Sequence, residues 1–519
     1  MSVEKGDPIP HRGDINSSDS QRKNAMKLDL RIVLMRVVFA SMVGRSPAQK
    51  LMRLLVLATA ALWSVDGWSG DTERPNIILM MADDLGYGDT GFNGNEIIKT
   101  PHLDKMARDG VKLTHFYAGG PVCSPTRGTF LTGRHYYRYG IWSANVGHLP
   151  KQEITLARLL KSKGYTTGHF GKWHVGTLSK THSTKGPGRK PAENFAPPWE
   201  RDYDRSFVVE SSVSTWDPGS DKNPFYDNGV TLAGNDPSLL GGAARVVVDR
   251  AVPFMEQAVK TDTPFLAVVW FNAPHEPIKA GPDYLAMYEG HGEAAHYYGC
   301  ITELDEQVGR IRKRLRDWGV ANNTLLCFCS DNGPEGKEPK GKKAGVTAGL
   351  RGRKRSLYDG GVRVPALAEW PGRIKPGSVS DTPCSTLDYL PMVANLTGYQ
   401  MPDDRPIDGQ DLMPILTGQT TERKKAIPFR ARGNATLVKN RYKMVLPKGE
   451  LYDLSKDWSE ENNIATGHPE RVETMTRELM AYLDSMQKSH AGEDYSDPSF
   501  KPLDEWDAFR KKREPSKRK

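Results

Sequence analysis

Three short apolar runs along the chain each end in a cluster of polar residues. Residues 76–81 end in Ala82-Asp83-Asp84, residues 265–271 end in N-A-P-H-E-P, and residues 325–329 end in S-D-N-G. Because these runs lack alternation and are separated by helical patterns, they predict buried strands of a sheet covered on both faces. Ligands of such α/β sheets collect at the carboxyl ends of the strands, so the polar clusters are expected to share one edge.

Helical patterns lie between these runs. Residues 154–163 predict an amphipathic helix that ends at Gly164 and leads into a fourth strand, 165–170, followed by G-K-W-H. Residues 294–318 place apolar side chains at helical spacing and stop at Gly319, which predicts a surface helix packed on the sheet.

The pattern changes after Leu416. Residues 427–432, 436–446 and 450–454 predict short strands, and residues 469–486 predict a helix. We therefore expect a catalytic domain over 71–425, a small α+β subdomain over 426–488 and a basic polar tail over 489–519.

A leader is expected over residues 1–70. Met52 opens M-R-L-L-V-L-A-T-A-A-L-W-S-V-D-G-W-S-G, a basic start, a short apolar run and small residues, as in a secretory signal peptide. The run 54–63 is too short to span a bilayer, so no stable membrane span is expected. We predict translation from Met52, a mature start between about Asp66 and Thr72, and a periplasmic or secreted protein; an uncleaved anchor or a core helix are the alternatives.

The composition favours a folded protein with a large core and argues against a nucleic-acid-binding protein. The chain has 519 residues, of which 38% are hydrophobic, and this is enough to bury a large core. Its net charge of +9 comes mostly from residues 1–70 and 501–519, so the body is close to neutral and no nucleic-acid partner is expected. The five cysteines lack metal-finger spacing.

The stretch P-V-C-S-P-T-R-G-T-F-L-T-G-R, residues 121–134, places a thiol at a predicted helix start. Ser124 suits an N-cap and Pro125 suits the first turn. The helix N-terminus and Arg127 would then favour an anion beside Cys123. The alternative is a structural cysteine before an ordinary helix.

Two strand ends carry oxygen ligands. Asp83, Asp84, Asp331 and Asn332 supply three carboxylates and one amide oxygen, a hard set suited to Ca²⁺ or Mg²⁺. Each pair alone is equally consistent with helix capping or turn formation.

The motif C-S-P-T-R followed by G-T-F-L-T-G-R resembles the maturation signature of type I sulfatases, which belong to the alkaline-phosphatase superfamily. The resemblance extends from Arg74 to about Ile464 and includes E-L-Y-D-L-S-K-D-W-S, although Trp458 stands where proline is common. It implies an α/β fold with a large, mixed, mostly parallel sheet between helices, and a small C-terminal α+β domain with an antiparallel sheet.

The resemblance also implies cofactors. A formylglycine-generating maturation enzyme would convert Cys123 to Cα-formylglycine, whose hydrate attacks sulfur. One Ca²⁺ would be bound by the residue at position 123 together with Asp83, Asp84, Asp331 and Asn332.

Further matches give the remaining site residues. Lys172 and His174 lie in G-K-W-H-V-G, His275 lies in P-H-E-P, and Lys354 lies in L-R-G-R-K-R-S-L-Y-D-G-G. By resemblance, Arg127 and Lys172 stabilise formylglycine and sulfate, and His174 is a base. His275 and Lys354 would contact sulfate and assist the leaving oxygen. Arg353 and Arg355, where glycines are frequent, favour a multiply sulfated substrate.

The sequence therefore predicts an exported, calcium-dependent sulfuric ester hydrolase that acts on a sulfated carbohydrate or an aryl sulfate. A phosphonate or phosphodiester hydrolase of the same superfamily is the nearest alternative. An unmatured, calcium-dependent protein that binds sulfated glycans without turnover is the alternative of another class.

Overall fold

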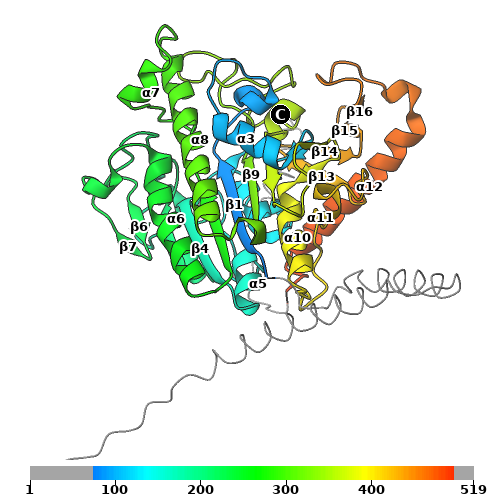
Figure 1. Ribbon diagram of the computed structural model, residues 1–519. Helices are drawn as coiled ribbons and strands as arrows, with labels where there is room; N and C mark the ends of the chain where they lie inside the picture. The colour runs from blue at the N-terminus through cyan, green and yellow to red at the C-terminus, as the bar shows by residue number, and fades with distance from the viewer. Residues whose placement is uncertain (1–73, 496–519) are drawn as a thin grey trace, which may run out of the picture. The chain divides into compact units, whose positions relative to one another are not determined.

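The computed structural model describes residues 74–495. The predicted leader, its cleavage site and the end of the basic tail lie outside the described residues. A central ten-stranded sheet organises the chain, with helices on both faces (Figure 1).

The central sheet is mixed. Its five middle strands, β9, β1, β8, β4 and β5, run parallel to one another, and its outer strands include antiparallel pairs. In sheet order the strands are β11 (Ser378–Ser380), β2 (Val111–Leu113), β10 (Leu367–Glu369), β9 (Thr324–Ser330), β1 (Asn76–Ala82), β8 (Phe265–Trp270), β4 (Thr166–Lys172), β5 (Arg205–Val209), β6 (Phe225–Asp227) and β7 (Val230–Thr231).

The predicted α/β architecture, with a central sheet covered on both faces, is confirmed. The apolar runs form strands there because their side chains are buried on both faces of the sheet. All seven residues of β1 are buried, because β1 pairs with β9 and β8 and is covered on both faces. The apolar runs that predicted strands in the sequence are β1, β8 and β9, and the fourth is β4. Each starts or ends within two residues of its predicted bounds.

Two apolar cores form, one on each face of the sheet. One core contains buried residues of α3 (Pro101–Asp109), α6 (Ala243–Lys260) and α8 (Ala294–Asp317). The other contains residues of α4 (Cys123–Thr132), α5 (Leu156–Ser162) and α10 (Tyr389–Leu396). Alternate residues of β1 belong to opposite cores, as the pleat of a strand requires.

The two predicted helices are present with slightly different ends. The Thr155 side chain accepts a hydrogen bond from the Arg158 N–H and caps α5, so this helix begins at Leu156 instead of residue 154. Helix α8 ends at Asp317, and Gly319 follows with a positive φ of 73°.

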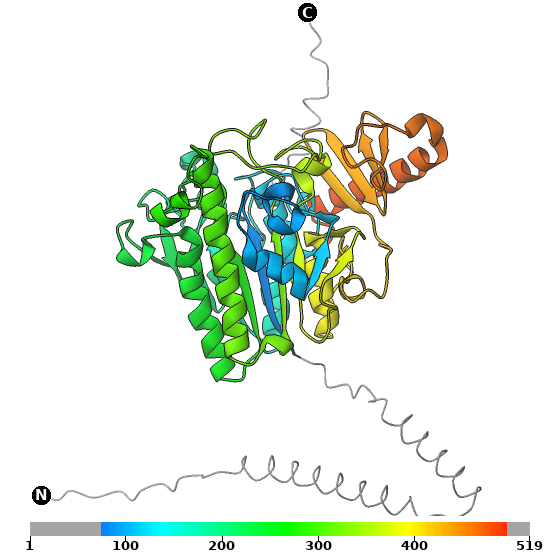
Figure 2. The same ribbon diagram turned by 45° about the horizontal axis from the view of Figure 1, so that its top comes forward.

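A separate four-stranded antiparallel sheet lies in the C-terminal part. Its strands are β13 (Ile427–Ala431), β14 (Asn434–Lys439), β15 (Tyr442–Leu446) and β16 (Glu450–Asp453), with α12 (Pro469–His490) against it. The single strand predicted over 436–446 is wrong: Asn440, with φ of 48°, turns the chain there between β14 and β15. Figure 2 shows this orange sheet on the far side of the body from the long green helices. The predicted domain boundaries stay predictions.

Shorter elements complete the described residues: β3 (Phe116–Tyr117), β12 (Cys384–Ser385), α7 (Pro282–Ala286), α9 (Asp359–Val362) and α11 (Met413–Leu416). No helix within residues 74–495 combines the length and apolar content needed to cross a membrane.

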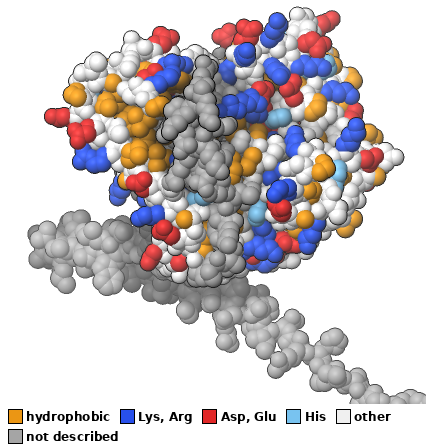
Figure 3. Space-filling view, turned by 180° about the vertical axis from the view of Figure 1, so that it is seen from behind, with side chains coloured by type: hydrophobic (Ala, Val, Ile, Leu, Met, Phe, Trp, Pro, Cys, Tyr) orange, Lys and Arg blue, Asp and Glu red, His pale blue; other side chains and the backbone are white. Residues whose placement is uncertain are grey.

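On the face shown in Figure 3, basic and acidic side chains are interspersed, in keeping with the nearly neutral body.

Buried ion pairs connect the small sheet to the catalytic body. Lys443 of β15 lies 2.6 Å from Asp359 of α9 and 2.9 Å from Glu460, and all three side chains are fully buried. Tyr117 of β3 donates a hydrogen bond to the same Asp359. Charges removed from water stay ionised only when they are paired, so Lys443 fixes the position of α9 relative to the sheet.

We predict that Lys443→Ala lowers the free energy of unfolding by about 3–5 kcal/mol, because it removes the cation shared by two buried carboxylates, of which only Asp359 keeps another cation, Arg363, among the described residues. Lys439→Ala is the matched control: its partner Glu478 and Lys439 itself are partly exposed, and such a pair contributes about 0–1 kcal/mol. Urea unfolding followed by tryptophan fluorescence measures both values. Equal losses in the two variants would contradict a structural role for the buried pairs.

Candidate active site

The polar residues that follow the central strands meet at one edge of the sheet. Asp83 and Asp84 follow β1, Asp331 and Asn332 follow β9, His275 follows β8, and Lys172 ends β4. Backbone hydrogen bonds hold these strand ends together, from the Asp83 N–H to the Ala273 carbonyl and from the Asp331 N–H to the Ala82 carbonyl. The structure thus brings together residues that are far apart in the sequence.

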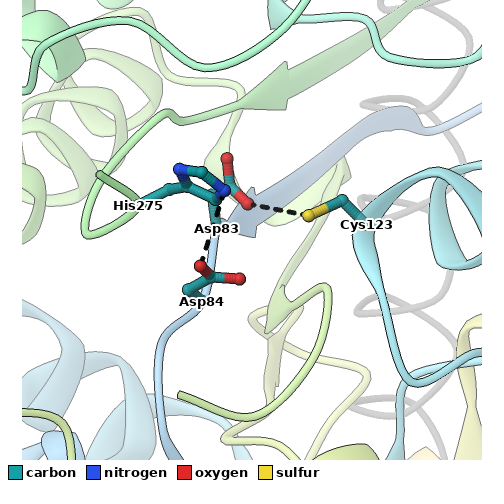
Figure 4. A group of neighbouring side chains, drawn as sticks. All are labelled: Asp83, Asp84, Cys123 and His275. Carbon is teal, nitrogen blue, oxygen red and sulfur yellow. Dashed lines mark hydrogen bonds and ion pairs between the residues drawn. The ribbon is translucent and has the colours of Figure 1, made fainter. Parts of the chain in front are cut away.

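Cys123 is the first residue of α4 and points at the strand ends (Figure 4). Its side chain is buried, and Sγ lies 3.4 Å from Asp83 Oδ1. The predicted N-cap at Ser124 is wrong: Val122 occupies that position in an extended conformation, and Ser124 Oγ accepts a hydrogen bond from the Asn145 N–H instead. The helix therefore starts at Cys123, two residues earlier than a side-chain cap at Ser124 would allow.

The thiol of Cys123 is held in its neutral form. Burial raises its pKa well above the ordinary value, and the carboxylate of Asp331 raises it further, against the opposing effect of Lys172 and Lys354. A thiolate is the reactive form of cysteine, so the unmodified side chain is a poor nucleophile at neutral pH.

Arg127 and Lys172 lie on one side of the carboxylates. Arg127 Nη2 lies 2.7 Å from Asp331 Oδ2, and its guanidinium is over the Trp270 ring at 4.9 Å from the ring centroid. Lys172 Nζ lies 2.6 Å from Asp83 Oδ2 and 2.8 Å from Ser212 Oγ. Burial raises the pKa of Asp83, but Lys172, His275 and Arg127 outweigh it and hold this pKa well below its usual range.

Lys354, His275 and Asn332 surround Asp84 on the other side. Lys354 Nζ lies 2.6 Å from Asp84 Oδ1, and His275 Nε2 lies 3.7 Å from Oδ2. Asn332 donates to Oδ1 at 2.7 Å. Burial opposes the charged form of Lys354, but Asp84 and its neighbours raise the Lys354 pKa well above the ordinary value, so this ammonium is permanent at physiological pH.

His174 is held as a neutral base. It adopts a left-handed backbone with φ of 60°, and its Nε2 lies 2.8 Å from the Asn145 side-chain oxygen. That contact assigns the proton to Nε2 and leaves Nδ1, which has no hydrogen-bond partner among the described residues, as the acceptor. Burial, then Lys172 and Arg127, lower the His174 pKa well below its usual range.

The site contains a set of atoms suited to a metal ion. Ligand atoms of Asp83, Asp84, Cys123 and His275 all lie within 4.8 Å of one another. The predicted ligand Asn332 adds a buried Oδ1 that has no hydrogen-bond partner among residues 74–495. The predicted ligand Asp331 lies beside this set, with its Oδ1 accepting from the Asp84 N–H. Carboxylate and amide oxygens of this kind fit a hard divalent cation.

A cavity of about 960 Å³ opens above these groups. Its walls include Cys123, His174, His275 and Lys354 at the base, and residues that the sequence did not single out, among them Asn145, Ser212 and Glu335. These three residues lie on loops, and loops have no periodic sequence pattern from which a position in the site could be predicted. Arg353, predicted to add positive charge for the substrate, instead donates to the carbonyls of Glu335, Gly336 and Gly345 and does not line the cavity.

Comparison with known proteins assigns the family. The family model described as Sulfatase matches residues 75–399, and the model for the C-terminal region of N-sulphoglucosamine sulphohydrolase matches residues 352–489. The chain belongs to the sulfatase family. The polar cluster described above, from Asp83 to Lys354, lies within the first matched region.

Relatives agree with this assignment. The sulfatase is 35% identical over 415 residues to steryl-sulfatase of Rattus norvegicus, a match that covers 66% of this chain and 70% of that protein. It is 32% identical to arylsulfatase A of Homo sapiens, over 84% of this chain and 90% of that protein. Among solved structures, Ps i-CgsB in complex with k-i-k-neocarrahexaose matches with a TM-score of 0.70 and 25% identity, over 84% of this chain and 97% of that chain. The predicted activity class is confirmed: the protein is a sulfatase of the alkaline-phosphatase superfamily, which hydrolyses sulfate esters.

We predict that Cys123 in protein made without a maturation enzyme reacts with iodoacetamide at pH 7.5 at least about tenfold more slowly than cysteine in a short peptide, because its raised pKa keeps the thiol protonated. The rate of carboxamidomethylation is followed by peptide mass spectrometry, with the same protein in urea as the control. A native rate equal to that of the peptide would contradict the raised pKa.

Proposed function

We propose that this sulfatase removes sulfate from a sulfated carbohydrate through a Cα-formylglycine at position 123 and one bound Ca²⁺. The observation that carries the proposal is the convergence of three buried carboxylates and three buried cations around Cys123, which lines the cavity. An ordinary structural cysteine would not require six charges taken out of water around it.

Formylglycine and Ca²⁺ would complete this scheme. Cys123 would be converted to formylglycine by a maturation enzyme, and the hydrate of that group would supply a hydroxyl nucleophile for sulfur. Asp83, Asp84, Asp331 and Asn332 would hold Ca²⁺ together with residue 123, and the ion supplies positive charge that offsets the charge of the sulfate group. Lys172 and Lys354 form ion pairs with Asp83 and Asp84.

Arg127 and Lys172 orient the sulfate and the residue at position 123. Arg127 is fixed by Asp331 on one side and by the Trp270 ring below, so its guanidinium cannot swing away from the site. Lys172 is fixed by Asp83 and Ser212. Positive charges held rigidly in a buried site stabilise a transferring anionic group at little reorganisation cost.

His174 is the base of the scheme. Its Nδ1 carries the free lone pair, because Nε2 donates to the Asn145 oxygen. As a general base, Nδ1 would accept a proton from a hydroxyl group carried by the residue at position 123. The lowered pKa keeps this nitrogen unprotonated at neutral pH.

His275 and Lys354 assist the departing oxygen of the sugar. Both side chains reach Asp84, on the side of the site away from Arg127, and both line the cavity. His275 Nδ1 donates to the Glu276 carbonyl, which orients Nε2 toward the site, and Nε2 carries a proton for the leaving oxygen only when the ring is protonated. Lys354 provides the permanent cation.

A saccharide substrate is supported by the solved relative that contains neocarrahexaose and by the size of the cavity, which is large enough for a sugar ring. Export to the periplasm or the medium, signal cleavage and the predicted domain boundaries belong to the same proposal. Parallel assays of an aryl sulfate and an aryl phosphodiester distinguish the sulfatase from a phosphodiester hydrolase.

We predict that Cys123→Ala lowers kcat for 4-nitrophenyl sulfate by at least about 10³-fold, because the side chain supplies the nucleophile. Cys123→Ser is expected to be equally inactive if maturation requires cysteine. Cys384→Ala, at another buried cysteine outside the cavity, is the control and should keep its kcat. Mass spectrometry of the peptide that contains position 123 reports the aldehyde. An active alanine variant, free of contaminating sulfatase, would refute the mechanism.

We predict that EDTA lowers both Tm and activity and that Ca²⁺ restores both, because binding to the folded state alone adds about 2.7 kcal/mol at a concentration of 100 Kd. Asn332→Ala should reduce the rise in Tm on adding Ca²⁺, whereas Asn322→Ala, at an exposed position, should not. Differential scanning calorimetry measures the effect. Identical Ca²⁺ responses in the two variants would remove Asn332 from the set of ligands.

We predict that His275→Ala and Lys354→Ala impair hydrolysis of a sugar sulfate more than that of 4-nitrophenyl sulfate. A sugar alkoxide needs a proton or cation to leave, and such help commonly contributes about 10²–10⁴-fold, whereas an aryl oxide leaves more easily. The ratio of kcat/KM for the two substrates is the measurement. Equal losses on both substrates would mean that the two residues bind the common sulfate group instead.

A further inference from the structure

The wall of the active-site cavity carries more positive charge than a single sulfate requires. Besides Lys354 at the base, the lining includes Lys185, Lys343, Arg355 and Arg432. Two of these are paired with carboxylates of the same wall: Lys343 lies 2.9 Å from Glu276, and Arg355 lies 2.6 Å from Glu335. Their charge is therefore largely neutralised in place.

Lys185 and Arg432 differ from these pairs. Neither side chain forms an ion pair or a hydrogen bond with any residue in the described part of the chain, and both are exposed while lining the cavity. Because Cys123 is buried at the base, exposed residues of the same wall lie toward its open side. Two unpaired cations thus border the path to the nucleophile.

The backbone of Arg432 is unusual for its residue type. Arg432 and Gly433 form the two-residue turn between β13 and β14, and both have positive φ, 49° and 93°. Turns of this kind favour Asn-Gly or Gly-Gly, and a long side chain with positive φ is strained there. The turn holds a guanidinium in the wall of the cavity at a position where asparagine would give the more stable hairpin.

The loop that carries Lys185 is fixed beside the reactive groups. Ser183 donates to Glu210 at 2.5 Å, and Thr184 Oγ1 lies 3.0 Å from Ser211 Oγ. The next residue, Ser212, bonds to Lys172. Lys185 is therefore carried by a segment anchored to the base of the site, although its own side chain is free.

We infer that Lys185 and Arg432 bind a second anionic substituent of the saccharide, so that the preferred substrate carries at least one sulfate or carboxylate besides the sulfate that is cleaved. This inference rests on the proposed function and adds the substrate's charge pattern to it. Trp142 and Tyr137 line the same cavity. They offer apolar surface for the sugar ring that connects the cleaved sulfate to the second anionic substituent.

The test measures competition against 4-nitrophenyl sulfate by matched saccharides. The probes are D-glucosamine bearing one or two sulfates, and neocarrabiose units bearing one or two sulfates. Each saccharide competes with 4-nitrophenyl sulfate for the cavity, whether it is hydrolysed slowly or only bound. An apparent Ki can therefore be measured for every probe. The wild type should bind the doubly sulfated member of at least one pair about tenfold more tightly, as expected for a charge-assisted contact of about 1.4 kcal/mol.

The double variant Lys185→Ala/Arg432→Ala should lose most of this tenfold preference, and the single variants show which cation contributes more. Lys343→Ala removes one positive charge from the same wall but from an existing ion pair, so it should retain the wild-type ratio. Raising the salt concentration should weaken the preference in the wild type and leave the double variant unaffected.

Three outcomes would overturn the inference: a wild-type Ki ratio near one for both pairs, a double variant that retains the wild-type ratio, or a Lys343→Ala variant that loses as much as the double variant. Failure of the proposed function is distinct from all three. If the proposed function is wrong, the matured wild-type protein will not hydrolyse 4-nitrophenyl sulfate. Each of the three outcomes above is measured as inhibition of that hydrolysis, so it can be observed only when the protein is an active sulfatase.

Discussion

Pairing of buried charges is the constraint on which the active site depends. Three carboxylates pair with three cations at the site: Asp83 with Lys172, Asp84 with Lys354, and Asp331 with Arg127. All six side chains are buried. Each carboxylate has a cation within about 3 Å of it, so no member can be removed alone without leaving an uncompensated charge. In the proposed function, the same arrangement supplies oxygen atoms for a divalent cation and positive groups for sulfate.

A second set of buried ion pairs gives the small C-terminal sheet a part in the site. Lys443 ties β15 to α9, and α9 follows the loop that carries Lys354. The hairpin between β13 and β14 brings Arg432 to the cavity wall. The sheet therefore supports one cation at the base and supplies another at the wall, although no reactive group lies within its strands.

The sequence predicted the central strands and the residues that gather at their ends, because an apolar run that stops at Asp-Asp or Asp-Asn indicates a buried strand leading into a polar edge. It missed the turn at Asn440, because residues 436–446 were interpreted as one strand although the polar residues Lys439 and Arg441 flank this left-handed position. It also misplaced the cap of α4, because Val122 lacks a capping side chain and gives no signal. Asn145, Ser212, Lys185 and Arg432 were out of reach for a different reason: their roles come from loops that only tertiary contacts bring to the cavity.

The position of β1 in the sheet has a consequence for how the chain is assembled. This strand is the first in the described residues, yet its neighbour β9 supplies Asp331, which is 247 positions from Asp84. During synthesis β1 emerges with every side chain destined for the interior and must wait for most of the domain before both of its edges are covered. Closing so long a loop is slow, and an uncovered apolar strand pairs readily with other chains. Nascent chains that stop before β9 are thus an aggregation hazard for the cell, and a completed active site reports that the whole domain has been made.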